Sequence, residues 1–202
     1  MSKIIVIGAG QAGGRLVQNL LANDDDNKVY LFGEEDYLPY ERPPLSKSFL
    51  SGERKIEDLY LVPSTNFNSK KLKISLGNKI QKISLEKKQI TDSYSDTYAY
   101  DKIVFANGSS PKKINSNKVK GIFYLRNIDD SLNIRSNIAI SQNIVLLGGG
   151  FINLEIASSI RQKFPNKKIS IIEFSSEILG RNSNSDIRKV IYNIHLNNNI
   201  KF

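Results

Sequence analysis

The chain contains no cysteine among its 202 residues. It can therefore form no disulfide, and it supplies no thiolate nucleophile, iron–sulfur ligand or redox dithiol of its own. The one histidine, His195, cannot start a metal site without a second histidine or a cysteine, so we expect it to have a solvent-facing or helix-end role. Any redox chemistry must depend on a bound cofactor.

Long hydrophobic runs are also missing. No segment approaches the roughly 18 uncharged apolar residues that a membrane-spanning helix needs. The apolar run at residues 4–7 is stopped by Gly8, which fits neither a signal peptide nor a transmembrane helix. We therefore expect a cytoplasmic protein without membrane contact.

Acidic residues are fewer than basic ones, 20 against 29, which gives a formal net charge of +9. Such a balance could indicate nucleic acid, an anionic membrane or an acidic protein as partner. The basic residues are scattered, however, in short runs such as Lys70-Lys71 and Lys167-Lys168, without a dense basic block or interleaved aromatics. This pattern favours a solvated surface, and we expect no nucleic-acid partner.

One supersecondary pattern occurs twice. In the first copy, an apolar strand at residues 4–7 runs into the glycine-rich stretch 8–13, a helical pattern follows, and a strand at 29–32 leads to Glu34. The first glycine and the acid are 26 residues apart (34 minus 8). This order of elements is typical of a βαβ unit that binds a dinucleotide.

In the second copy, a strand at 144–147 runs into the stretch 148–153, and a helix and a strand at 169–172 lead to Glu173. The spacing from the first glycine to the acid is 25 residues (173 minus 148). Two such copies predict an α/β fold with two Rossmann-like dinucleotide-binding units.

Each glycine of these turns has a physical task. The glycines permit the tight turn, let the backbone approach a pyrophosphate at the helix N-terminus, and let helix and strand pack closely. Asn153 occupies the third glycine position of the second copy, where we expect it to push the helix outward slightly or to form local hydrogen bonds. The candidate glycines are Gly8, Gly10, Gly13, Gly148 and Gly150.

The acids after the second strands are candidates for hydrogen bonds to an adenosine ribose. These are Glu34, with Glu35 as a substitute, in the first copy and Glu173 in the second. A carboxylate at this place disfavours a 2′-phosphate, so Glu173 favours NADH over NADPH. Arg181 is the nearby cation that could oppose this preference.

Between the copies, the short alternating stretch 79–100 predicts a small antiparallel meander. A buried strand at 102–106 follows, and a polar turn then leads out of the first domain. We place the domain boundary near Lys112, which divides the chain into residues 1–112 and 113–202. Helices are expected near 129–138 and 186–196.

A proline-rich motif at residues 39–47, PYERPPLSK, follows the first acid. Pro43-Pro44 imposes an extended turn, and residues 45–50 are expected to form a helix that ends at Gly52. Arg42 and Lys47 are thereby held where a cation can neutralise a pyrophosphate or lie near a flavin ring.

This motif, the two glycine turns, YLRNIDD at 124–130 and GGGFINLEIA at 148–157 together resemble the FAD-dependent, NADH-linked ferredoxin reductases. Putidaredoxin and rubredoxin reductases belong to that family, and apoptosis-inducing factor is a relative. The resemblance implies a glutathione-reductase-like FAD/NAD(P) fold. A hydride would pass from NADH to FAD, and electrons would then pass to an acidic ferredoxin or rubredoxin-type iron–sulfur protein.

The resemblance also implies site residues for FAD in domain 1–112. Gly8, Gly10 and Gly13 would lie at the pyrophosphate, Glu34 at the adenosine ribose and Arg42 at the phosphates. Lys47 would lie close to the reactive flavin edge, and the backbone of Ile80 would hold the adenine. Asn107-Gly108 stands where Thr-Gly is usual, and Lys112 replaces an arginine, so the flavin-side turn is altered.

For the nicotinamide cofactor, the resemblance implies a site in domain 113–202 formed by Gly148, Gly150 and Glu173. Phe151 and Glu155 would meet the nicotinamide ring, and Glu155 is expected to pair with Lys47. Lys47 and Glu155 are therefore the candidate catalytic residues.

The chain stops as a further strand begins near residues 200–202, so we expect a truncated form of this fold. The rest of the nicotinamide domain, a returning FAD-domain segment with a Gly-Asp contact, and a C-terminal interface domain would be missing. We therefore expect open sheet faces and poor flavin binding. Two alternatives remain: a non-catalytic redox-sensing flavoprotein related to apoptosis-inducing factor, or an inactive fragment.

Overall fold

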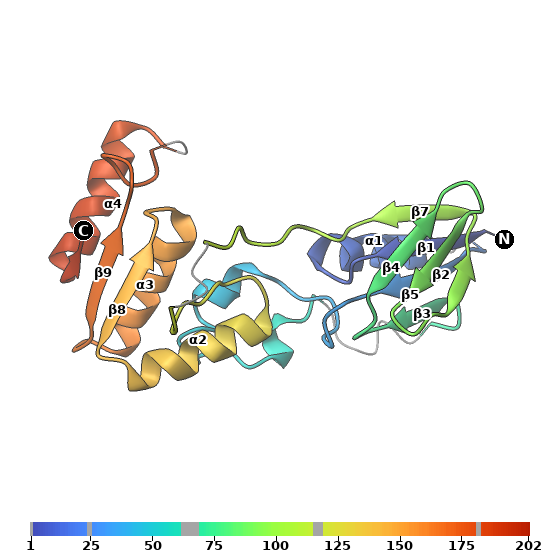
Figure 1. Ribbon diagram of the computed structural model, residues 1–202, viewed down its shortest axis with the longest axis horizontal. Coiled ribbons are helices and arrows are strands. Elements are labelled where there is room, and N and C mark those ends of the chain that lie inside the picture. Colours follow the sequence, from blue (N-terminus) through green and yellow to red (C-terminus); the bar gives the residue numbers. More distant parts are fainter. Residues whose placement is uncertain (1, 24–25, 62–68, 115–118, 181–182) are drawn as a thin grey trace. The chain divides into compact units, whose positions relative to one another are not determined.

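The computed structural model describes residues 2–23, 26–61, 69–114, 119–180 and 183–202 (Figure 1). The chain divides into two compact units. One comprises Met1–Arg42 and Glu57–Ser110, and the other comprises Pro43–Ile56 and Pro111–Phe202. The segment that contains the second half of the proline motif therefore packs with the C-terminal half of the chain. Within the described ranges, no helix has the length and hydropathy needed to cross a bilayer.

The first unit is built on a parallel sheet of β1 (Lys3–Ile7), β2 (Lys28–Phe32), β3 (Leu72–Ser75) and β7 (Lys102–Phe105), in the order β3-β2-β1-β7. Helix α1 (Gln11–Ala22) connects β1 to β2. The βαβ unit expected from the sequence is thus present. Strand β3 was not foreseen, because its four residues carry too short an alternating pattern to stand out.

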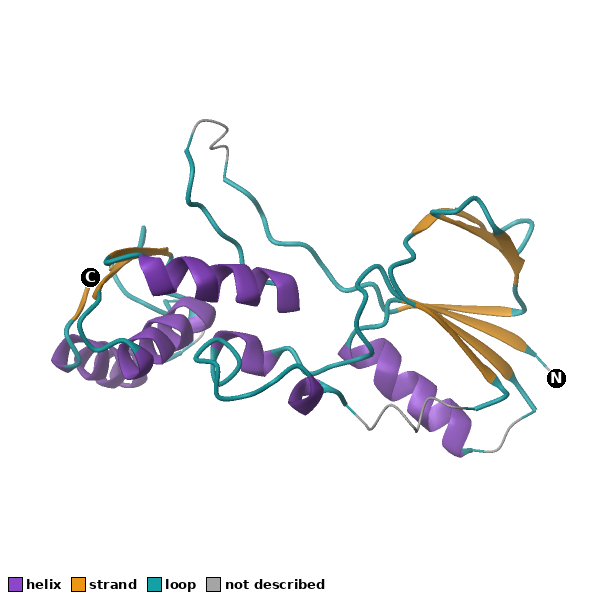
Figure 2. Ribbon diagram, turned by 90° about the horizontal axis from the view of Figure 1, so that it is seen from below, coloured by secondary structure: helices purple, strands orange, loops and turns teal. Residues whose placement is uncertain are grey.

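Two further layers lie on opposite faces of this sheet (Figure 2). On one face, α1 contributes Val17 to a core with Val6 and Leu31. On the other face, Ile5 and Phe32 pack against Ile90 of the antiparallel sheet. That sheet is the predicted meander, made of β4 (Ile80–Ser84), β5 (Gln89–Asp92) and β6 (Thr97–Ala99).

The second unit repeats the parallel arrangement with three strands in the order β10-β9-β8. The strands follow one another across the sheet in a single direction, so right-handed crossovers put α3 and α4 on the same face. Leu154 and Ile160 of α3 belong to the core there, and Ile191 of α4 packs against it. The elements are α2 (Ile128–Ile140), β8 (Asn143–Leu147), α3 (Phe151–Lys163), β9 (Lys168–Ile172), α4 (Ser185–Asn197) and β10 (Ile200–Lys201).

The opposite face of this second sheet is apolar and exposed. Val145 and Leu147 of β8 are each 55% exposed, and Ile172 of β9 is 57% exposed. Parallel sheets are usually covered on both faces. We expected open faces on both sheets. The second sheet has such a face, but the expectation is wrong for the parallel sheet of the first unit, which α1 and the antiparallel sheet cover on its two faces.

Strand register brings each glycine turn beside its acid. Ile7 is paired with Phe32, and the N–H of Gly8 donates to the Phe32 carbonyl at 2.8 Å. In the second unit, Leu147 is paired with Ile172, and the N–H of Gly148 donates to the Ile172 carbonyl at 2.7 Å. The two βαβ units therefore place equivalent residues side by side.

The proline segment differs from expectation. A 3₁₀-helix, η1 (Pro43–Ser46), begins at the first proline, and turns follow as far as Gly52, which has φ +81°. The helix expected at residues 45–50 is therefore misplaced, because Leu45 and Ser46 end a 3₁₀-helix and residues 47–50 form turns. Proline holds φ near −65°, which suits a helical first turn, so the helical conformation starts at the prolines instead of after them. A second 3₁₀-helix, η2 (Glu57–Leu59), lies in the first unit.

A buried carboxylate, Asp92, organises the antiparallel sheet. It accepts hydrogen bonds from Asn78 Nδ2 at 2.8 Å and Tyr98 Oη at 3.2 Å, and from the backbone N–H groups of Asp96 at 2.9 Å and Tyr94 at 3.0 Å. Burial by itself raises the pKa of Asp92, but these hydrogen bonds outweigh it and lower the pKa below the ordinary 3.8.

We predict that Asp92→Asn lowers the melting temperature by several degrees at pH 7, because an amide NH₂ would face hydrogen-bond donors. A depressed folded-state pKa stabilises the protein fully above the unfolded value, and this stabilisation is lost as the pH falls through the folded value. The gap between Asp92→Asn and the unsubstituted protein should therefore shrink below about pH 3.8. Thermal melts across this range test it. The exposed Asp96→Asn serves as control, and a gap that stays constant with pH would contradict the assignment.

Candidate functional site

Two glycines of the first turn are required by packing. A Cβ on Gly8 would lie 2.2 Å from the Ala106 carbonyl oxygen, and Gly8 has φ +109°. A Cβ on Gly13 would lie 1.9 Å from the carbonyl oxygen of Gly8. Gly13 lets helix α1 approach the end of β1 this closely, and Gly8 lets the chain after β7 pass close to the turn.

The middle glycine of each turn has room around it. A Cβ on Gly10 would find its nearest described neighbour, Arg42 Nη2, 3.8 Å away. A Cβ on Gly150 would meet no described atom within 4 Å. Packing therefore does not require glycine at Gly10 or Gly150. Open space here is what a pyrophosphate needs to approach the backbone, so both turns fit a dinucleotide.

The helices after these turns begin without side-chain caps. In the described residues, α1 and α3 have no side-chain hydrogen bond at their N-caps and no acid in their first turns. By contrast, Asn127 and Asp130 form a capping box on α2, and Asn184 caps α4. The first N–H groups of α1 and α3 thus remain directed at whatever occupies the turn, and the helix dipole favours an anion there.

Arg42 lies beside the first turn. Its Nη2 forms an ion pair with Glu35 Oε1 at 2.6 Å, and its guanidinium lies 5.2 Å from the centre of the Tyr40 ring. The Tyr40 hydroxyl donates to Glu35 Oε2 at 2.5 Å. Glu35 therefore orients a cation next to Gly10, as a phosphate-binding position requires.

The neighbouring acid, Glu34, has a different partner. Its exposed carboxylate pairs with Lys79 Nζ at 2.8 Å. The sequence left open whether Glu34 or Glu35 would reach a ribose, and the structure shows that Glu35 is engaged with Arg42 and Tyr40. Lys79 was not foreseen, because it lies 45 residues from Glu34 along the chain.

The remaining candidate FAD-binding residues are Ile80, Gly108 and Lys112. Ile80 begins β4 and packs beside Ile5 and Phe32. Gly108 follows β7 in the left-handed region with φ +64°, which suits glycine. The side chain of Lys112 is exposed.

In the second turn, Gly148 has φ +99°, and Glu173 binds the turn itself. Its carboxylate accepts the N–H of Ser175 at 2.8 Å and the N–H of Gly149 at 2.5 Å. These backbone hydrogen bonds lower the pKa of Glu173, and the bond from Ser175 has a larger effect than the bond from Gly149. The acid is held ionised beside the turn.

Asn153 stands at the third glycine position of the second turn and forms local hydrogen bonds. Its Nδ2 donates to the carbonyls of Leu147 at 2.7 Å and Gly148 at 2.9 Å. Of the two outcomes expected from the sequence, local hydrogen bonding is the one that the structure shows. The side chain satisfies two carbonyls at the end of β8, which a glycine would leave to other partners.

The expected pair of Lys47 and Glu155 is present. Lys47 Nζ lies 2.8 Å from Glu155 Oε1, and the buried Ser46 Oγ donates to Glu155 Oε2 at 2.5 Å. Ser159 Oγ donates to the Ser46 carbonyl at 2.9 Å, which fastens the proline segment to α3. Phe151, the first residue of α3, is 50% exposed.

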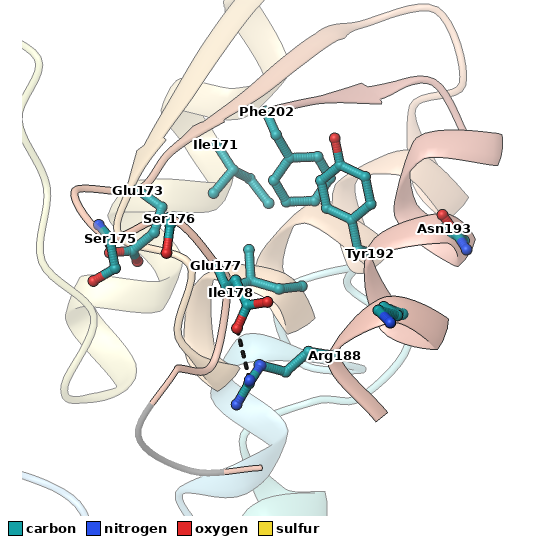
Figure 3. A pocket seen from close by; sticks show the side chains of 11 residues that line it. Ile171, Glu173, Ser175, Ser176, Glu177, Ile178, Arg188, Tyr192, Asn193 and Phe202 are labelled. Atoms are coloured by element: carbon teal, nitrogen blue, oxygen red, sulfur yellow. Dashed lines mark hydrogen bonds and ion pairs between the residues drawn. The ribbon is translucent and has the colours of Figure 1, made fainter. Parts of the chain in front are cut away.

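A pocket of about 450 Å³ lies beside Glu173 (Figure 3). Sequence reasoning missed its cations, Arg188 and Lys189 of α4, because they lie 15 and 16 residues beyond Glu173 (188 and 189 minus 173). Arg181, the cation considered from the sequence, falls outside the described residues. The lining residues are Ile171, Glu173, Ser175, Ser176, Glu177, Ile178, Arg188, Lys189, Tyr192, Asn193 and Phe202.

His195 lies in the last turn of α4, in agreement with the expected helix-end role. Its Nδ1 is 2.9 Å from the Ile191 carbonyl, and its Nε2 is 3.1 Å from the Leu154 carbonyl of α3. The His195 side chain therefore connects α4 to α3. Among the described residues, no cluster of potential metal ligands is present.

Residues 2–202 match the family of pyridine nucleotide-disulphide oxidoreductases. The chain belongs to this family. Its members use FAD and a nicotinamide dinucleotide, which agrees with two dinucleotide turns in one chain. The absence of cysteine means that this chain cannot form the disulphide in the family's name.

Relatives within this family include a rubredoxin–NAD(+) reductase of Pseudomonas putida. It is 31% identical over 180 residues, which make up 88% of this chain and 46% of that protein. The ferredoxin–NAD(+) reductase component of a p-cumate 2,3-dioxygenase system, also from Pseudomonas putida, is 28% identical over 99% of this chain and 50% of its own length. This chain spans about half the length of these relatives.

Solved structures of family members share the fold. NADH:rubredoxin oxidoreductase from Clostridium acetobutylicum matches with a TM-score of 0.87 and 26% identity, over 99% of this chain and 52% of its own. The reductase in a covalent putidaredoxin reductase–putidaredoxin complex matches with a TM-score of 0.92 and 23% identity, over 99% and 49% of the two chains. The glutathione-reductase-like α/β fold expected from the sequence is confirmed.

We predict that Gly10→Ala and Gly13→Ala separate ligand binding from folding. Gly10→Ala should keep the free energy of unfolding within about 1 kcal/mol and weaken FAD binding, because a methyl group enters the space for the pyrophosphate. Gly13→Ala should lower the free energy of unfolding by several kcal/mol or prevent folding. Circular dichroism melts and FAD titration measure the two effects. Unchanged FAD affinity in Gly10→Ala would show that this space is not used.

We also predict that Ser46→Ala lowers the free energy of unfolding by about 1 kcal/mol, because it removes a partly buried hydrogen bond to the charged Glu155. Ser48→Ala, two residues along, is the matched control and should change it by only a few tenths of a kcal/mol. Urea denaturation of both variants gives the comparison. Equal effects would mean that the Ser46 hydroxyl does not support Glu155.

Proposed function

We propose that this chain forms the dinucleotide-binding part of an NADH-dependent reductase that delivers electrons to a ferredoxin or rubredoxin-type iron–sulfur protein. The observation that carries the proposal is the pair of strand-to-helix turns, each with an open middle glycine and an uncapped helix, and each beside an acid. The chemistry would come from the cofactors, FAD taking a hydride from NADH and releasing electrons singly.

In this proposal, residues 1–112 bind FAD and residues 113–202 bind NADH. The N–H groups at the start of α1 would hold the FAD pyrophosphate, with Arg42 beside them, and Glu34 would accept the adenosine ribose hydroxyls. For Glu34 to do so, its exposed ion pair with Lys79 must open or share the carboxylate, which costs little at the surface. Ile80, Gly108 and Lys112 complete the proposed FAD-binding set.

The second turn would hold the nicotinamide dinucleotide. Gly148 and Gly150 leave the backbone accessible at the start of α3, and Glu173, which lies beside this turn, would accept ribose hydroxyls. Hydrogen bonds lower the pKa of Glu173, so this carboxylate is charged at neutral pH. A 2′-phosphate would face that charge, which supports NADH as the coenzyme.

Lys47 and Glu155 would position the reacting groups. A hydride transfer needs no protein acid or base, so their proposed task is to keep an ammonium group in one place beside the cofactors. Glu155 holds Lys47 through Oε1, while Ser46 occupies Oε2, so the carboxylate cannot rotate without losing a contact. Phe151, exposed at the start of α3, would meet the nicotinamide ring.

The electron acceptor is proposed from the relatives, whose names include rubredoxin, ferredoxin and putidaredoxin reductases. A formal net charge of +9 suits an acidic partner, since opposite charges accelerate encounter. We propose that the reaction takes place in the cytoplasm, where it would draw on the NADH pool.

The proposal is tested by reduction of a ferredoxin and a rubredoxin with the purified protein and FAD, with NADH and NADPH compared on one preparation. FAD is supplied in excess, since we expect this chain to bind flavin weakly. Under this condition we expect transfer with NADH, slower transfer with NADPH, and rates that fall steeply with salt. Glu173→Gln should reduce the preference for NADH, whereas the exposed Glu86→Gln should not change it. A clear preference of the unsubstituted protein for NADPH would overturn the assignment of Glu173.

A further inference from the structure

The pocket beside Glu173 combines an apolar interior with a charged rim. Ile171 and Ile178 are buried, and the rings of Tyr192 and Phe202 lie with their centres 4.6 Å apart. Figure 3 shows Arg188 and Glu177 together on one side of this pocket and Glu173 on another. An apolar interior with a polar rim is typical of a site for a small ligand.

Two residues that line this pocket, Ile178 and Glu173, lie against the glycine turn. A Cβ on Gly149 would lie 2.7 Å from Ile178 Cγ2 and 3.2 Å from Glu173 Oε2. The residue before Ile178 is Glu177, so the loop that carries both acids lies directly against the turn. A ligand that reaches Glu173 from the turn therefore enters the same pocket that Arg188 lines.

The charge of Arg188 is already balanced. Its Nη2 lies 2.6 Å from Glu177 Oε2, and its Nη1 donates to the Ser183 carbonyl at 2.6 Å. The Arg188 side chain is only 18% exposed, whereas that of Glu177 is 50% exposed. A largely buried guanidinium is thus held by a carboxylate at the edge of the pocket.

We propose that Glu177 is a second determinant of coenzyme specificity, which acts by withholding Arg188 from a ligand 2′-phosphate. This rests on the proposed binding of NADH at the second turn. Arginine binds phosphate strongly through its paired N–H donors, so an unbalanced Arg188 in this pocket would attract the 2′-phosphate that Glu173 repels. Glu177 prevents this, because its carboxylate already forms an ion pair with the same guanidinium.

The alternative source of discrimination is Glu173 acting alone. In that case, removal of the negative charge at Glu177 would leave the preference between the two coenzymes unchanged. With the charge of Glu177 removed, Arg188 would retain the Ser183 carbonyl as its described partner and would carry an uncompensated, largely buried charge. Such a charge is costly, and an incoming anion relieves the cost.

The test measures binding without turnover. Adenosine 5′-monophosphate and adenosine 2′,5′-bisphosphate differ only in the 2′-phosphate, and calorimetry gives both affinities for each variant. Glu177→Gln should raise the affinity for the bisphosphate, relative to the monophosphate, by about five- to tenfold. The double variant Glu177→Gln/Arg188→Gln should lose this gain, and Glu86→Gln, the charge-matched control in the other unit, should show none.

Each outcome decides the matter. An unchanged affinity ratio in Glu177→Gln, or a gain that persists in the double variant, overturns the role of Glu177 while the monophosphate still binds. If neither nucleotide binds the unsubstituted protein, the proposed nicotinamide site itself is wrong. Glu177→Ala provides a second neutral replacement, and thermal melts confirm that each variant is folded before its affinities are compared.

Discussion

The close approach of a helix to the strand before it is the constraint on which both units depend. In the first unit, the Gly13 position lies so near the Gly8 carbonyl that any side chain would collide with it. In the second unit, Asn153 occupies the equivalent position and uses its amide to bind the carbonyls at the strand end. The equivalent position of the turn is thus occupied by a residue without a side chain in the first unit and by a hydrogen-bonded side chain in the second.

A second organising feature is the attachment of the proline segment to the helices of the second unit. Ser131 of α2 donates to the Leu45 carbonyl, Ser159 of α3 donates to the Ser46 carbonyl, and Arg135 donates to the Phe49 carbonyl. The Leu45 and Ser46 carbonyls belong to the 3₁₀-helix, whose last carbonyl groups need partners outside it, whereas the Phe49 carbonyl lies beyond that helix and also accepts the Gly52 N–H. As a result, the place of Lys47 is set by α3 through Glu155 rather than by the strand that precedes the motif.

Acid–arginine pairs lie beside both turns but act in opposite directions. Glu35 holds Arg42 close to the open middle glycine of the first turn, where in our proposal a cation supports a pyrophosphate. Glu177 holds Arg188 at the rim of the second pocket, where in our proposal it keeps a cation away from a ligand. The same interaction can therefore present a charge or sequester it, depending on which face of the guanidinium remains accessible.

Local patterns in the sequence determined much of this protein. Strand periodicity, glycine spacing and the alternating stretch after Lys79 identified both βαβ units and the antiparallel meander, because these features depend on residues close together in the chain. The sequence also placed α2 and α4 to within a few residues, since their capping residues and apolar spacing are local.

Apart from the Lys47–Glu155 pair, which the family resemblance implied, tertiary structure decided which distant side chains meet. The partners of Glu34 and Glu173, the contribution of α4 to the pocket and the attachment of residues 43–56 to the second unit follow from packing between segments far apart in sequence. Lys167 shows the difference: its sequence neighbours indicate a surface charge, yet its Nζ is buried against the Ala139 and Ser141 carbonyls at the end of α2. Hydrogen-bond partners depend on where the chain returns in space, and no local pattern records that position.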